Sequence, residues 1–81
     1  MDYKVEISRR ALKDLRKLDA QIAKRLLVKI ADLREDLKGD VKRLTDFEPE
    51  YRLRIGDYRV LFDVDGSDVI VRRIKNRREA Y

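Results

Sequence analysis

Residues 51–62 read YRLRIGDYRVLF, and this stretch decides the fold. Apolar and charged residues alternate on both sides of Gly56-Asp57, with the period of two that is expected of half-buried strands. A glycine in the first position of a two-residue loop is typical of a type II′ hairpin turn. This turn sets Arg54 directly opposite Arg59, with Arg52 on the same face. We therefore predict a β-hairpin with one apolar face and one face of arginines.

The sequence before the hairpin predicts one strand and two helices. Residues 2–7 alternate in polarity and are expected to form a strand. Ser8 and Asp19 are suitable N-cap residues. Behind them, apolar residues recur at helical spacing over residues 9–18 and 20–38, and a glycine follows the second run. Two amphipathic helices joined by so short a link are expected to pack as a hairpin on one sheet.

The remaining segments complete the order β-α-α-β-β-β. Residues 40–50 contain the only proline and no sustained period, so we predict a loop there, with Leu44 and Phe47 turned inward. The predicted strands of the second half are residues 51–55, 58–64 and 69–74. The expected fold is α+β, a helical hairpin packed on one face of a small, mostly antiparallel four-stranded sheet. We expect a single domain over residues 1–81.

Composition excludes several classes of site. The chain has 81 residues, of which 46% are charged, and its net charge is +5. A chain of this length buries one compact core and leaves no room for a deep enclosed site. It has no cysteine and no histidine, which excludes disulfides, zinc–thiolate sites and Ser/His/Asp triads. The carboxylates show no metal-ligand spacing, so we expect no metal and no cofactor. The opening residues do not resemble a signal peptide and no apolar run could span a bilayer, so we expect a cytoplasmic protein with no membrane partner.

The basic residues concentrate in the second half of the chain. Arginines that lie directly opposite each other destabilise a sheet by up to about 1 kcal/mol, and such a local conflict often marks a functional site. The face predicted to carry Arg52, Arg54 and Arg59 continues into a run of five bases without an acid, Arg72, Arg73, Lys75, Arg77 and Arg78. Forked guanidinium donors suit phosphate. We therefore predict a nucleic-acid-binding face, with the terminal Tyr81 available to stack on a base.

Two simpler interpretations stay open for these charges. The hairpin arginines could be solvated side chains that pair with Asp63 or with Glu48 and Glu50. The charge runs Arg9-Arg10 and Lys24-Arg25 lie on the polar faces of the predicted helices, where solvation is the ordinary role of charged residues.

Three features resemble the RelE/ParE superfamily of bacterial and archaeal toxins. They are the order of elements, the opening of the first helix from Ser8 to Leu15, and the blocks at residues 51–62 and 77–81. The basic hairpin and the terminal Tyr81 are more similar to RelE than to ParE. The resemblance implies a metal-independent endoribonuclease that cleaves messenger RNA in the ribosomal A site and so inhibits translation. In that reaction the RNA 2′-hydroxyl attacks the scissile phosphate.

The resemblance also implies roles for individual residues. The catalytic set carries over to Arg52, Arg54, Arg59, Arg77 and Tyr81, with Arg59 at the scissile phosphate. The RNA-binding set comprises Arg72, Arg73, Lys75 and Arg78, and Lys75 replaces Arg77 if the alignment is counted back from the terminal tyrosine. Arg52 and Arg54 stand where well-studied RelE toxins carry lysines. A guanidinium clamps phosphate but is a poor general base, so proton transfer would fall to Tyr81 or the rate would depend on positioning of the RNA.

The resemblance implies partners as well. They are a cognate RelB-like antitoxin, the ribosome and messenger RNA, and the toxin–antitoxin complex is expected to bind its own promoter DNA through the antitoxin. The exposed apolar helix edges and an unpaired sheet edge suit an acidic or amphipathic antitoxin segment. Two other functions remain open: a ParE-like toxin that poisons DNA gyrase without nuclease activity, and an inactive nucleic-acid-binding relative.

Overall fold

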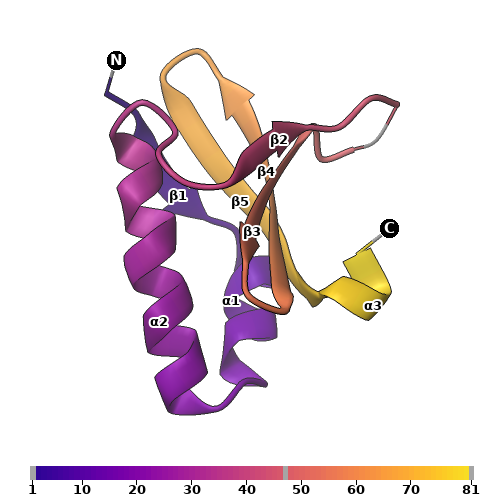
Figure 1. The fold of residues 1–81 in the computed structure, drawn as a ribbon. Helices are drawn as coiled ribbons and strands as arrows, with labels where there is room; N and C mark the ends of the chain where they lie inside the picture. Colours follow the sequence, from indigo (N-terminus) through magenta and orange to yellow (C-terminus); the bar gives the residue numbers. More distant parts are fainter. Residues whose placement is uncertain (1, 47, 81) are drawn as a thin grey trace.

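The computed structural model describes residues 2–46 and 48–80. Five strands form one sheet in the order β1-β5-β4-β3-β2, and helices α1 and α2 lie side by side against one face of it (Figure 1). No helix among these residues is both long and apolar enough to cross a membrane. The elements are β1 (Lys4–Ile7), α1 (Arg9–Arg16), α2 (Ala20–Ala31), the 3-10 turn η1 (Asp32–Arg34), β2 (Val41–Arg43), β3 (Tyr51–Ile55), β4 (Tyr58–Asp65), β5 (Asp68–Asn76) and α3 (Arg77–Ala80).

The β3–β4 hairpin has the predicted register. Arg54 pairs with Arg59, and Ile55 pairs with Tyr58 across the turn. Of the two turn residues only Gly56 has a positive φ, at +57°, as a type II′ turn requires. The predicted apolar and basic faces of the hairpin are therefore confirmed.

The core lies between the helices and the apolar face of the sheet. Its centre is Phe62 on β4, which has no exposed surface and whose ring stacks on that of Tyr51 with centroids 5.4 Å apart. Side chains from both layers surround it. Ala11 of α1 is fully buried, and the largest of the other fully buried side chains are Leu26, Ile30, Leu33, Leu53, Val60, Val69 and Val71. The helical spacing of the apolar residues gives α1 and α2 one apolar face each, and burial of these faces holds the helices on the sheet.

The prediction of four strands is wrong, because the sheet has five and is mixed. The additional strand β2 lies inside the segment predicted to be a loop and pairs antiparallel with β3. It is three residues long, too short to show a period, and its pairing partner is supplied by the tertiary fold. Strand β1 pairs parallel to β5, and the other pairs are antiparallel. Leu44 is half-buried, and Phe47 lies outside the described residues.

The second helix is shorter than predicted. It ends at Ala31 rather than at residue 38, and the chain continues through η1. The apolar residues predicted to continue the helix are still turned towards the core. Leu33 is fully buried in η1, and Leu37 is half-buried although its positive φ of +57° is not that of an α-helix. Gly39 does not cap the helix. It lies against β3, where a Cβ would be 2.8 Å from Leu53 Cδ1, so the chain needs a glycine to pass so close.

Asp14 of α1 closes the part of β5 that β1 leaves unpaired, a role that the sequence did not reveal. Strand β1 pairs with β5 only as far as Val71. Beyond it, Asp14 Oδ2 accepts hydrogen bonds of 2.9 Å from the Ile74 N–H and from Arg73 Nε. Burial raises the pKa of Asp14, but these two hydrogen bonds, together with the positive charges of Arg73 and Arg10, outweigh it and hold the pKa below its ordinary value. The carboxylate is therefore a charged anchor between α1 and the sheet.

We expect Asp14→Asn to lower the free energy of unfolding by about 1–3 kcal/mol at pH 7, because the charged acceptor of the buried Ile74 N–H and of the partly buried Arg73 guanidinium is lost. A depressed pKa in the folded state contributes stability above the unfolded-state pKa near 4, and this contribution is lost as the pH falls through the folded-state pKa. The difference in the free energy of unfolding between wild type and Asp14→Asn should therefore decrease as the pH falls from 5 to 2. Urea unfolding across that range measures it, with the exposed Asp65→Asn as control. A constant gap would contradict a role for the charge.

Candidate nucleic-acid interface

The hairpin register places three cations side by side on the face that α1 and α2 leave open. Arg54 on β3 pairs with Arg59 on β4, which pairs in turn with Lys75 on β5. Directly paired residues point to the same side of a sheet, so the three side chains form one row, which we call the cation row. Arg54 is exposed and the other two are half-buried. No acidic residue separates them.

Arg59 is held at the turn of the hairpin. Its Nη1 donates hydrogen bonds of 3.0 Å to the carbonyl oxygens of Gly56 and of Tyr58. Within residues 2–46 and 48–80, neither Arg59 nor Lys75 forms an ion pair with a carboxylate. Two of the three positive charges in the cation row are therefore not neutralised.

Asp40, just before β2, joins two of the predicted site arginines. Its Oδ2 lies 2.8 Å from Arg54 Nε and its Oδ1 lies 3.7 Å from Arg52 Nη1, while its carbonyl oxygen accepts the Arg54 N–H. The Arg52 side chain is only 11% exposed, against 57% for Arg54. Arg52 Nε and Nη1 are buried and have no hydrogen-bond partner among the described residues. Arg54 is thus the accessible member of the pair, and Arg52 is the buried member.

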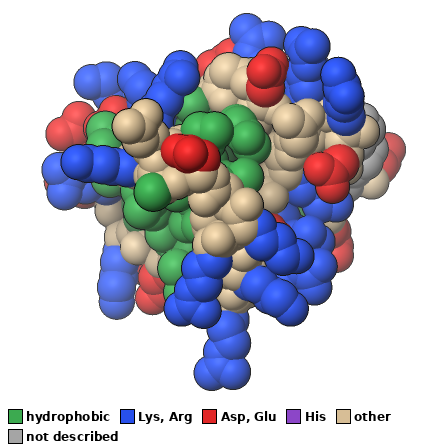
Figure 2. All heavy atoms as spheres, turned by 90° about the horizontal axis from the view of Figure 1, so that it is seen from below, with side chains coloured by type: hydrophobic (Ala, Val, Ile, Leu, Met, Phe, Trp, Pro, Cys, Tyr) green, Lys and Arg blue, Asp and Glu red, His purple; other side chains and the backbone are tan. Residues whose placement is uncertain are grey.

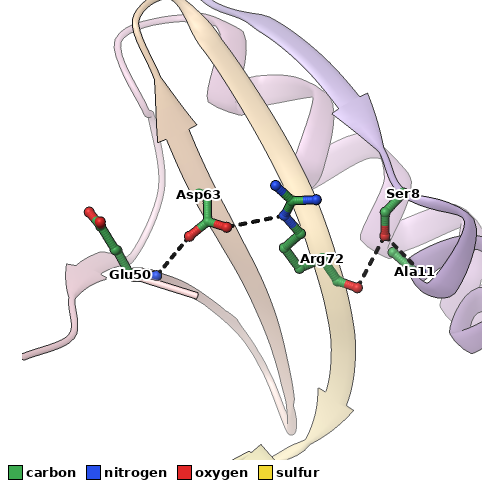
Figure 3. Close-up of polar contacts among 5 residues, drawn as sticks. All are labelled: Ser8, Ala11, Glu50, Asp63 and Arg72. Atoms are coloured by element: carbon green, nitrogen blue, oxygen red, sulfur yellow. Dashed lines mark hydrogen bonds and ion pairs between the residues drawn. The ribbon is translucent and has the colours of Figure 1, made fainter. Parts of the chain in front are cut away.

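The cations of β5 separate into different surroundings. Arg72 Nε lies 3.1 Å from Asp63 Oδ2, and the other oxygen of this carboxylate accepts the Glu50 N–H, so Asp63 links β5 to the start of β3 (Figure 3). Ser8 then donates to the Arg72 carbonyl oxygen. Arg73 turns away to Asp14 on α1, where it supports the fold.

The end of the chain brings further cations to the tip of the hairpin. Helix α3 lies on the other side of the sheet from α2 (Figure 1). The Arg77 N–H donates to the Asp57 carbonyl oxygen at 2.8 Å, and Arg77 Nε lies 3.8 Å from the Asp57 carboxylate. Arg78 is exposed. Tyr81, predicted to be catalytic, lies outside the described residues.

The expectation that Asp63, Glu48 and Glu50 pair with the hairpin arginines does not hold for Arg52 and Arg54. Asp63 pairs with Arg72 and Glu50 with Arg43, whereas Arg52 and Arg54 pair with Asp40, which the sequence analysis did not consider. Asp40 stands twelve or more residues away and in a segment without a period. No local pattern could have revealed it, because β2 brings it to β3 only in the folded sheet.

This arrangement suits binding of a phosphodiester. Forked guanidinium donors and an ammonium in one row can contact adjacent non-bridging oxygens. They can also stabilise negative charge that develops on phosphorus substituents. Guanidinium groups do not accept protons near neutral pH, so the two arginines of the row are suited to electrostatic stabilisation and not to general base catalysis.

Comparison with known proteins identifies the family. The profile of the ParE toxin of the type II toxin–antitoxin system parDE matches residues 5–81. This chain belongs to the RelE/ParE family of type II toxins. It is 32% identical to toxin RelE3 of Methanocaldococcus jannaschii, over 96% of this chain and 94% of that protein. It is 38% identical to the putative toxin RelE1 of the same organism, over 100% and 97%.

A solved structure agrees with this assignment. The toxin superposes with a TM-score of 0.82 on the toxin–antitoxin complex RelBE2 from Mycobacterium tuberculosis, with 27% identity over 95% of this chain and all of that chain. The profile is that of ParE and the relatives are RelE toxins, so what the matches share is the family. The fold and the toxin class of the resemblance are confirmed.

We expect Asp40→Asn to destabilise the toxin by about 1–2 kcal/mol, because it leaves the buried Arg52 guanidinium without a carboxylate. Arg52→Met keeps an unbranched side chain of similar length and should absorb much of this cost when combined with Asp40→Asn. Urea unfolding of the two single variants and the double variant measures the coupling. As a control, the same double-mutant cycle with Arg54→Met in place of Arg52→Met should give a smaller coupling energy, because Arg54 is exposed. Additive effects in the Arg52 cycle would contradict the role of Asp40.

Proposed function

We propose that this toxin is a ribosome-dependent endoribonuclease that cleaves messenger RNA in the ribosomal A site and inhibits translation in the cytoplasm. The observation that carries the proposal is the cation row of Arg54, Arg59 and Lys75, two of whose members have no carboxylate partner among the described residues. A structure that places like charges together at a cost in stability supports a bound anion. The relatives named RelE toxins support the same class.

In the proposed reaction the RNA 2′-oxygen attacks the neighbouring phosphorus, and the bond from phosphorus to the 5′-oxygen breaks. The products are a 2′,3′-cyclic phosphate and a 5′-hydroxyl. Arg59 and Arg54 contact the non-bridging oxygens and stabilise the added negative charge. Lys75 is the one member of the cation row that can release a proton, so we assign it to protonate the departing 5′-oxygen. The phenolate form of Tyr81 takes the proton of the 2′-hydroxyl and becomes the neutral phenol.

The remaining predicted residues support this centre. Arg52 is too buried to reach RNA and acts on Arg54 through their shared partner Asp40. Arg77 and Arg78 stand at the hairpin tip and contact the flanking RNA backbone. Arg72 and Arg73 carry ion pairs with Asp63 and Asp14, so their part in RNA binding is smaller.

The proposed partner is a cognate RelB-like antitoxin, since the solved neighbours include toxin–antitoxin complexes. A shallow groove of about 450 Å³ between α1 and α2 carries apolar side chains. Leu12 and Leu27 at this groove are 40% and 41% exposed. Lys24 and Arg16 lie at the same groove. This combination suits an acidic amphipathic antitoxin helix, and promoter DNA would be bound through the antitoxin.

The test is to induce the toxin alone and map new 5′ ends on translated and untranslated copies of one messenger. We expect cuts only in the translated copy, and Arg59→Ala should reduce their rate by about a hundredfold or more. Arg34→Ala removes an equal charge from η1, away from the cation row, and should leave cutting unchanged. Growth arrest without new ends would replace this proposal by a gyrase poison. Neither arrest nor cuts would favour an inactive nucleic-acid-binding relative.

A further inference from the structure

The net charge of the toxin resides in its helices. Residues 9–31 contain eight Lys and Arg and two Asp, a net charge of +6, whereas residues 32–81 carry twelve bases and twelve acids. All eight bases are exposed. None of them forms an ion pair with any residue that the structure describes. The helical hairpin therefore carries the excess positive charge of the chain. Among the described residues, Arg59 and Lys75 of the cation row also lack a carboxylate partner.

Arg25 and Lys29 are the helix cations nearest to the candidate interface. They stand one turn apart on α2 and line a groove of about 280 Å³ between α2 and the β3–β4 hairpin, together with Lys38, Arg54 and Gly56. Two carboxylates, Asp32 and Asp40, also line it. Asp40 is already paired with Arg54 and Arg52.

The groove continues the cation row around the edge of the sheet. Arg54 belongs to both, and the hairpin tip lies between two guanidinium groups. On one side Arg59 donates to the Gly56 carbonyl oxygen, and on the other Arg25 Nη2 would be 4.0 Å from a Cβ on Gly56. Seen from the end of the molecule that holds this turn, Lys and Arg side chains border much of the surface (Figure 2). The groove and the cation row thus meet at Arg54 and at the hairpin turn.

We infer that Arg25 and Lys29 form an accessory phosphate-binding subsite that holds the RNA backbone next to the cleaved nucleotide. The inference rests on the proposed function, because it gives the same RNA a second contact. Phosphate is favoured over an acidic protein segment for two reasons. The groove is lined mainly by charged side chains and glycines, and the exposed leucines that would anchor a protein helix lie in the separate groove between α1 and α2.

The test measures binding of the purified toxin to a single-stranded RNA 20-mer that carries 2′-O-methyl groups throughout. This RNA cannot be cleaved, because the attacking hydroxyl is blocked. Arg25→Gln/Lys29→Gln should weaken binding about tenfold at 0.1 M salt. It should also make the dependence of log K on log salt less steep by about 1.4, since each phosphate contact on a single strand contributes about 0.7.

The matched control is Lys13→Gln/Lys17→Gln. This pair has the same spacing and loses the same charge, but Lys13 lies on α1, Lys17 is the C-cap of α1, and both are absent from the groove. It should change the affinity and the salt dependence much less. Both pairs are exposed and unpaired, so urea unfolding should show equal stability for all three proteins. An equal loss of RNA affinity in both variants would overturn the subsite and indicate non-specific electrostatic attraction. Unchanged RNA affinity in both variants would also overturn it.

Two further measurements separate the competing explanations. Poly-glutamate is titrated in parallel, and weaker binding of poly-glutamate with unchanged RNA binding would assign the groove to an acidic protein partner and overturn the inference. Cleavage of a translated messenger is measured on the wild type. Cleavage by the wild type with unchanged RNA binding by Arg25→Gln/Lys29→Gln would refute the subsite alone. The opposite result is also informative. If only Arg25→Gln/Lys29→Gln loses RNA binding and the wild type does not cleave, the nuclease proposal is refuted and the RNA-binding subsite is retained.

Discussion

The register of the β3–β4 hairpin is the constraint on which the rest of the molecule depends. The two-residue turn at Gly56 fixes which residues lie opposite each other. Side chains alternate strictly along a strand, so a slip of one residue would exchange the two faces. Leu53 and Phe62 would then leave the core, and Arg54 would enter it. One glycine with a positive φ thus decides both where the helices pack and where the cations gather.

This register has an electrostatic cost that distant acids partly offset. Each acid that pairs with a site cation comes from another segment: Asp40 precedes β2, Asp63 lies on β4, Asp14 belongs to α1 and Asp57 to the turn. These pairs hold most of the arginines in defined positions. Among the residues that the structure describes, Arg59 and Lys75 have no such carboxylate partner, and the cations of residues 9–31 form no ion pair. Positive potential therefore surrounds the hairpin tip from both layers of the fold.

Asp14 shows how stability and the candidate site are connected. Its carboxylate satisfies the Ile74 N–H next to Lys75 and at the same time holds Arg73 against α1. One anchor thus fixes the strand position from which Lys75 joins the cation row. Arg73 and Ile74 are thus both held by one acid that lies about sixty residues earlier in the sequence.

Sequence alone determined the local features: the N-caps Ser8 and Asp19, the starts of α1 and α2, the three antiparallel strands of the second half and the two faces of the hairpin. It did not reveal α3. The features it determined depend on periodicity, capping and turn chemistry, which act over a few residues. Only the tertiary structure decided that residues 41–43 form a fifth strand, that α2 ends at Ala31, that Asp14 seals β5 and that Asp40 joins Arg52 to Arg54. Each depends on a partner far along the chain, and a short or aperiodic segment carries no signal of a contact that exists only after folding.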